Sequence, residues 1–136
     1  MTDKIFIDSN IWIYAAMEDS NEKSVIAKKL IEKPSFVSTQ VINEISVNLL
    51  RKYQYTESEI VSFVTNIGAC CQIQQLTIQT CLNASSLREQ YFLSFWDSLI
   101  VASALESGCA TLYSEDMQHG LNIEQIRLVN PFVVEE

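Results

Sequence analysis

Short apolar runs alternate along the chain with longer stretches in which apolar residues recur at helical spacing. The apolar runs predict strands over residues 4–8, 35–38, 71–76, 111–113 and 126–129. The helical spacing predicts helices over residues 11–16, 21–33, 39–53, 56–67, 78–91 and 97–106. Strands that alternate with helices in this way are typical of a parallel sheet covered by helices on both faces. The pattern therefore predicts an α/β fold with a central parallel sheet.

Two of the predicted helices carry a further structural signal, one for burial and one for its N-terminal cap. The helix over residues 97–106 is apolar on nearly all sides, so we expect it to be buried. The helix that starts near residue 56 has Thr56 followed three residues later by Glu59, which matches a capping box. We therefore assign Thr56 and Glu59 to structure alone.

The composition favours one domain. The chain has 136 residues, 48% of them hydrophobic, with only three Gly and two Pro, so we expect a single domain over residues 1–136 without a linker. No apolar run approaches the roughly 20 residues that cross a bilayer, and nothing at the N-terminus marks the chain for export. The cysteines lack C-x-x-C spacing, which favours structural thiols in a reducing cytoplasm; they are Cys70, Cys71, Cys81 and Cys109.

The charge balance is acidic. Lys and Arg number 9 against 17 Asp and Glu, giving a formal net charge of −8. This charge argues against a protein that coats nucleic acid passively. It is compatible with a protein that cuts nucleic acid if some of its carboxylates hold divalent cations, because those cations would lie where the phosphate must bind.

Four acidic residues fall where such a site is expected. In an open parallel sheet, ligands bind beyond the carboxyl ends of the strands. Asp8 ends the first predicted strand and Asp116 follows the fourth, while Glu44 lies inside the helix after the second strand and Asp97 begins the helix that leads to the fourth. We expect all four carboxylates to point into one crevice.

Carboxylates suit phosphodiester hydrolysis assisted by metal ions. Mg²⁺ takes few carboxylates together with water and phosphate oxygens, and two such ions roughly 4 Å apart stabilise the attacking and the leaving oxygen. The mechanism needs no nucleophilic side chain. The sequence agrees, because it contains no G-x-S-x-G elbow, no Walker A loop and no G-x-G-x-x-G motif.

Each of the four acids also has a purely structural interpretation. Asp8 could cap the helix that follows it. Glu44 could be an ordinary surface residue of its helix. Asp97 lies three residues after Ser94, a spacing that approximates a capping box and makes the structural interpretation of Asp97 as strong as the functional one when it is taken alone.

The segment around the fourth acid offers further polar side chains. Asp116 could be a turn residue, with Glu115 as an alternative ligand. Asn10 and Ser114 are candidates to orient the carboxylates or the water of a metal ion. His119 resembles a general base, but a single loop histidine is more often solvated and metal-assisted hydrolysis needs none, so it is left out of the catalytic set.

The tryptophans are interpreted as structural. We expect Trp12 and Trp96 to be core aromatic residues rather than platforms on which nucleic-acid bases stack.

Taken together, these segments resemble the PIN-domain family, and within it the VapC-type toxins of toxin–antitoxin pairs. The similarity spans nearly everything from residue 3 to residue 132. It is most specific where the order and spacing of distinctive segments match, namely residues 5–10, 93–104, 112–120 and 129–132.

The resemblance implies a three-layer α/β/α fold and a Mg²⁺- or Mn²⁺-dependent endoribonuclease that leaves 5′-phosphate and 3′-hydroxyl ends. It implies frequent homodimers and a partner antitoxin that lays a C-terminal segment across the acidic groove. It also places the acidic site at particular positions, with Asn10 and Ser114 beside the acids Asp8, Glu44, Asp97 and Asp116.

Two other classes of function are weighed against a nuclease. A PIN-like module could bind RNA or a partner without cutting, although retention of all four acids speaks against it. A phosphoaspartyl phosphatase would need a second Asp where Asn10 stands, and a receiver domain would need a Lys after a late strand, whereas none follows Arg88. The sequence therefore favours the nuclease.

Overall fold

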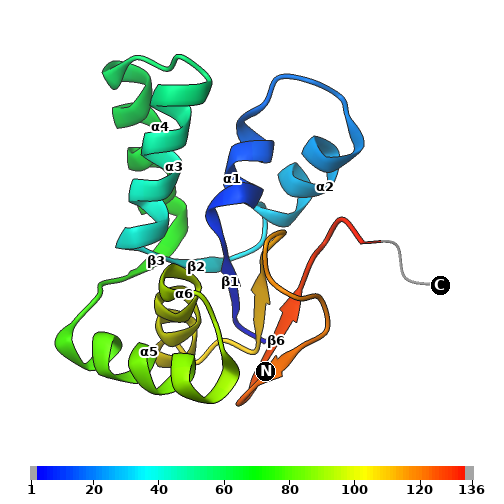
Figure 1. Ribbon diagram of the computed structural model, residues 1–136. Helices are drawn as coiled ribbons and strands as arrows, with labels where there is room; N and C mark the ends of the chain where they lie inside the picture. Colours follow the sequence, from blue (N-terminus) through cyan, green and yellow to red (C-terminus); the bar gives the residue numbers. More distant parts are fainter. Residues whose placement is uncertain (1–2, 134–136) are drawn as a thin grey trace.

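The computed structural model describes residues 3–133, and its elements follow the predicted alternation (Figure 1). The strands are β1 (Ile5–Ile7), β2 (Ser35–Ser38), β3 (Cys71–Gln74), β4 (Thr111–Tyr113), β5 (Asn122–Ile123) and β6 (Ile126–Val129). The helices are α1 (Ser9–Ala16), α2 (Glu22–Leu30), α3 (Thr39–Lys52), α4 (Glu57–Cys70), α5 (Ile78–Tyr91) and α6 (Phe95–Glu106).

The strands form one sheet in the order β3-β2-β1-β4-β6-β5. Every pairing is parallel except that of β5 with β6. The predicted parallel sheet is thus confirmed, with one antiparallel strand added at its edge. The sequence analysis missed β5, because its two residues are too few to show a strand pattern. Its turn into β6 passes through Glu124 at a φ of 52°.

The helices form two groups with the central strands between them (Figure 1). In one group α1 packs against α2 and α3, and α3 against α4, whereas in the other α5 packs against α6. This arrangement is the predicted three-layer α/β/α fold. Among residues 3–133, no helix is both long and apolar enough to cross a membrane.

The core lies where the central strands meet the helices. Phe6 of β1 and Leu112 of β4 are paired in register and fully buried. On α6 every residue from 98 to 104 is buried, which confirms the prediction for this helix. The predicted capping box of Thr56 and Glu59 also forms at the start of α4. The thiols of all four cysteines are free.

The strand order fixes where a ligand can bind. From β1 the chain proceeds through β2 to β3 on one side, and it then crosses to β4 on the other side of β1. The connections that leave β1 and β4 therefore diverge, which opens a crevice beyond the carboxyl ends of these two strands.

Candidate functional site

The carboxyl ends of β1 and β4 bring two polar side chains together. Ile7 pairs with Tyr113, so Asp8 and Ser114 are the next residues of adjacent strands. The backbone N–H of Asp8 donates to the carbonyl of Tyr113 at 3.0 Å, which extends the pairing to the start of the crevice. The position predicted for Asp8 is therefore where the connections diverge.

Asp8 is a buried carboxylate held by two donors. Its side chain is 3% exposed. One oxygen accepts from the backbone N–H of Ser9 at 2.7 Å and the other from the Ser114 hydroxyl at 2.8 Å. Burial raises the pKa of Asp8 from 3.8 to about 7; the two hydrogen bonds oppose this shift, and the charges of Glu44 and Asp97 add to it. Asp8 is also the N-cap of α1, so its structural interpretation holds alongside the functional one.

Asp116 is joined to the same network by Asn10 and Ser114. The Asn10 amide donates from Nδ2 to Asp116 Oδ2 at 3.0 Å, and its Oδ1 accepts from the backbone N–H of Glu115 at 3.3 Å. The Ser114 hydroxyl, which donates to Asp8, accepts from the backbone N–H of Asp116 at 3.2 Å. Asn10 and Ser114 thus hold the loop after β4 against the start of α1.

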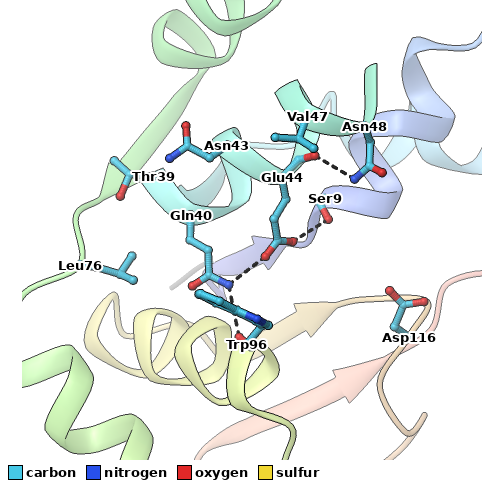
Figure 2. Close-up of a pocket in the computed structure, with 10 residues that line it drawn as sticks. All are labelled: Ser9, Thr39, Gln40, Asn43, Glu44, Val47, Asn48, Leu76, Trp96 and Asp116. Carbon is cyan, nitrogen blue, oxygen red and sulfur yellow. Dashed lines mark hydrogen bonds between the residues drawn. The ribbon is translucent and has the colours of Figure 1, made fainter. Parts of the chain in front are cut away.

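Glu44 points from α3 toward this network (Figure 2). Its Oε2 accepts from the Ser9 hydroxyl at 3.1 Å, and its Oε1 accepts from Gln40 Nε2 at 2.8 Å. The side chain is half-buried and orientated by both bonds, which is unlike a freely solvated helix residue. Sequence reasoning did not select Ser9 or Gln40, although Ser9 adjoins Asp8 and Gln40 lies one helical turn before Glu44.

Asp97 lies in the first turn of α6. Its backbone N–H donates to the Ser94 hydroxyl at 3.2 Å, so the capping suspected from the sequence is present. Its half-buried carboxylate has a raised pKa, chiefly because of desolvation; Ser94 lowers this pKa and the charge of Asp116 raises it. The cap uses the backbone of Asp97, so both interpretations of this residue remain compatible.

Glu115 and His119, the other candidates near Asp116, have structural partners. The Glu115 carboxylate accepts from the Tyr14 hydroxyl at 2.8 Å and from the Lys23 ammonium at 2.5 Å. His119 is half-buried, and its Nδ1 accepts from the backbone N–H of Asn130 at 3.0 Å. The ion pair turns Glu115 toward α1 and α2, which favours Asp116 over Glu115 as the acid of this loop.

The two tryptophans differ in environment. Trp12 is buried as predicted, and its indole N–H donates to the carbonyl of Ile7 at 3.3 Å. The prediction for Trp96 is wrong, because its side chain is 62% exposed. Burial of α6 begins at Ser98, so its first turn extends beyond the core and projects Trp96 outward.

A groove of about 730 Å³ runs past these side chains (Figure 2). It is lined by Ser9, Thr39, Gln40, Asn43, Glu44, Val47, Asn48, Leu76, Trp96 and Asp116. A second hollow of about 260 Å³ also has Ser9, Asn48 and Asp116 in its wall, and it continues to Lys52 at the end of α3. The two hollows adjoin, since they share these three residues, and together they make up a track that Glu44 and Asp116 line. Asp8 and Asp97 line neither hollow, so the expectation that all four carboxylates point into one crevice is met by only two of them there.

The donor set of this track fits a hard divalent cation that keeps some of its water. Within residues 3–133 no three His, Cys, Asp or Glu side chains meet closely enough to form a ready-made metal cluster. Mg²⁺ is nevertheless commonly held by only one or two carboxylates plus water. The one ion pair of the described residues joins Lys23 to Glu115, so Asp8, Glu44, Asp97 and Asp116 have no paired cation there.

An unsatisfied acceptor also lies beside the carboxylates. Gln40 Oε1 is buried and has no hydrogen-bond partner within the described residues. Water held by a cation in the groove would supply a donor to this oxygen. The orphaned oxygen and the uncompensated carboxylates therefore both fit a hydrated Mg²⁺ or Mn²⁺ ion.

Comparison with known families identifies the fold that carries this site. The family model for the PIN domain matches residues 5–120. The chain belongs to the PIN-domain family. The match includes all four acids as well as Asn10 and Ser114. A comparison with the sequences of characterised proteins finds no significant match.

Solved structures of toxins share this PIN fold. A toxin–antitoxin complex from Klebsiella pneumoniae has a TM-score of 0.71 and 19% identity, covering 96% of this chain and 99% of that one. VapC20 of Mycobacterium tuberculosis, a toxin that cleaves the sarcin–ricin loop, has a TM-score of 0.66 and 17% identity, covering 80% and 87%. VapBC2 of Rickettsia felis, bound to a fragment of promoter DNA, has a TM-score of 0.66 and 15% identity, covering 91% and 96%.

The burial of Asp8 in this PIN domain predicts a pH-dependent stability. Because the folded protein keeps the Asp8 proton up to a pH of about 7 and the unfolded chain releases it near 3.8, the free energy of unfolding falls as the pH rises through this window. The replacement Asp8→Asn removes this pH dependence, because asparagine does not ionise. Without metal, we therefore expect the free energy of unfolding of the variant, relative to that of the wild type, to rise by on the order of 2–4 kcal/mol between pH 4 and pH 8.

Urea unfolding at both pH values measures this difference. The altered hydrogen bonds of the variant change its free energy of unfolding by the same amount at both pH values, so this change cancels when the two pH values are compared. The variant Asp3→Asn, which changes an exposed carboxylate, should show no such difference. Parallel curves for wild type and Asp8→Asn across the pH range would contradict the burial argument.

Proposed function

We propose that this PIN domain is a Mg²⁺- or Mn²⁺-dependent endoribonuclease and the toxin of a toxin–antitoxin pair in the cytoplasm. The observation that carries the proposal is the buried Asp8 carboxylate, which no cation of the described residues pairs. Ser9 and Ser114 link it by hydrogen bonds to Glu44 and to the backbone of Asp116, whose side chains line the groove. Asp97 acts electrostatically on Asp8 from the first turn of α6. The known PIN-domain toxins that share the fold give this arrangement its chemical context.

The proposed metal ligands are Asp8, Asp97, Asp116 and Glu44. When bound, a divalent cation supplies Lewis acidity at the phosphate and activates water for attack. In the hydrolysis the water oxygen forms a bond to phosphorus and the bond from phosphorus to the 3′ oxygen breaks. That oxygen takes up a proton, which leaves a 3′-hydroxyl and a 5′-phosphate.

The protein contributes fixed orientation. Ser9 and Ser114 hold Asp8 from two sides, and the Ser9 hydroxyl also donates to Glu44. Asn10 holds Asp116 by an amide hydrogen bond. These neutral donors orientate the carboxylates without neutralising them, which is the support that metal ligands require.

Removing an acidic residue should impair cleavage more than removing a side chain that only orientates one. We expect Asp8→Asn to lower kcat/KM on single-stranded RNA by about 1000-fold, since metal assistance is worth several kcal/mol. Asn10→Ala, which releases Asp116 without removing an acid, should lower it by about 10- to 100-fold. Cleavage of a 5′-labelled RNA in Mg²⁺ or Mn²⁺ provides the measurement.

Asp3→Asn is the matched control, because Asp3 is an exposed carboxylate outside the groove. It should cut RNA as the wild type does. Cleavage that persists in EDTA, or in a folded Asp8→Asn variant, would refute the metal mechanism. Binding of Mn²⁺ and RNA with no cleavage of any RNA would favour the alternative, a PIN-like binding module.

Lys52 is proposed to contact an RNA phosphate away from the cut. Among the residues that line the two hollows it is the one cation. Lys52→Gln should weaken RNA binding and reduce the slope of log K against log salt by about 0.7, the value for one phosphate of a single strand. Lys29→Gln on α2, which lines neither hollow, should leave the slope unchanged. Equal slopes for wild type and Lys52→Gln would remove Lys52 from the RNA path.

We propose an antitoxin protein as the physiological partner, together with a homodimeric toxin. Two of the similar structures are a toxin–antitoxin complex and VapBC2. The unpaired carboxylates of the groove suit a partner segment with basic side chains. The antitoxin is tested by co-purification with the product of a neighbouring reading frame and by loss of RNA cleavage in that complex. The homodimer is tested by the mass of the isolated toxin, measured by light scattering. A monomeric toxin contradicts the dimer, and undiminished cleavage in the complex contradicts the inhibitor.

A further inference from the structure

Trp96 is the large aromatic side chain that the acidic groove exposes. It is 62% exposed, lines the same groove as Glu44 and Asp116, and contacts Phe95 edge-to-face with ring centroids 5.0 Å apart. An exposed indole beside several carboxylates contributes nothing to the core. Its position therefore calls for an interpretation other than packing.

The backbone of Trp96 is tied to the acidic site. Gln40 Nε2 donates to Glu44 Oε1 at 2.8 Å and to the carbonyl of Trp96 at 3.3 Å, so one amide joins α3 to the first turn of α6 (Figure 2). Asp97, the next residue, is fixed by the cap at Ser94. These contacts set the place of the indole relative to the carboxylates.

The track offers different surfaces at its two ends. At the end where Gln40 bonds the backbone of Trp96, the wall includes the exposed indole, whereas Ser9 and Asp116 also line the second hollow, which continues to Lys52. A nucleotide combines an apolar π-face with an anionic phosphate, so its two parts match the two ends of the track. A duplex cannot use this wall, because its bases are stacked on each other.

We propose that Trp96 is a platform on which an unpaired base of the RNA stacks, next to the phosphate at the carboxylates. The assignment rests on the proposed function, since RNA must enter the groove. Trp96 thereby makes the site selective for single-stranded RNA and positions the chain for cleavage. Stacking on an aromatic side chain accepts any base, so this contact selects strandedness rather than sequence.

Intrinsic fluorescence can report the contact directly, because the chain has two tryptophans and Trp12 is buried. The protein is titrated with a short single-stranded RNA, with Ca²⁺ in place of Mg²⁺ as the hard cation. We expect the RNA to quench the emission of the wild type. Trp96→Phe, whose remaining indole is Trp12, should bind RNA without the quenching. An RNA of the same length with abasic positions should quench the wild type weakly.

Affinity variants separate stacking from mere apolar contact. Trp96→Leu should weaken binding of the single strand by about five- to 150-fold, whereas Trp96→Phe keeps most of the affinity because phenylalanine also stacks. Phe92→Leu is the matched control, because Phe92 is 90% exposed and does not line the groove. It should bind like the wild type.

The outcomes separate this inference from the proposed function. Quenching that persists in Trp96→Phe, or equal affinity of wild type and Trp96→Leu, overturns the stacking role even where RNA is cut efficiently. Equal quenching by abasic and normal RNA overturns it as well. Loss of quenching and affinity in the expected variants supports the platform, even if no RNA is cleaved and the nuclease proposal fails.

Discussion

The arrangement of the site follows from one constraint, which is that the Asp8 carboxylate lies almost fully out of water without a cation beside it. Its pKa is raised to about 7, chiefly by burial, and the nearby charges of Glu44 and Asp97 contribute to this rise rather than relieving it. Such a group weakens the metal-free fold whenever it is ionised. A divalent cation bound to Asp8 would reverse that effect, so metal binding would be coupled to stability through this carboxylate.

The neighbours of Asp8 are hydroxyl and amide groups. The backbone of Ser9 donates to Asp8 while its hydroxyl donates to Glu44, and Ser114 bridges Asp8 to the backbone of Asp116. A lysine or arginine at either serine position would stabilise the carboxylates more strongly, but it would occupy the oxygens that a cation needs. The ion pair of Lys23 lies one residue away, at Glu115, where it fixes the loop and leaves Asp116 open.

Sequence patterns anticipated the parts of the site that depend on strand ends. Asp8 and Asp116 follow from the rule that ligands bind where connections diverge, and the structure places both beside that crevice. The exposure of Trp96 could not be predicted in this way. The apolar pattern of a helix predicts which face is buried, but it does not predict which turn extends beyond the core. The two-residue strand β5 and the amide of Gln40 were missed for a similar reason. Each is defined by a tertiary neighbour rather than by a local pattern.

The net charge of −8 describes the whole surface, but an RNA strand would meet only the groove. There the side chains are separated along the track: the carboxylates of Glu44 and Asp116, one lysine at the C-terminal end of α3, and an exposed indole at the opposite end. In the proposed function, a cation at the carboxylates would turn the most negatively charged part of the track into the point of phosphate binding. Acidic composition and attraction for RNA are therefore compatible once the metal is counted as part of the protein's charge.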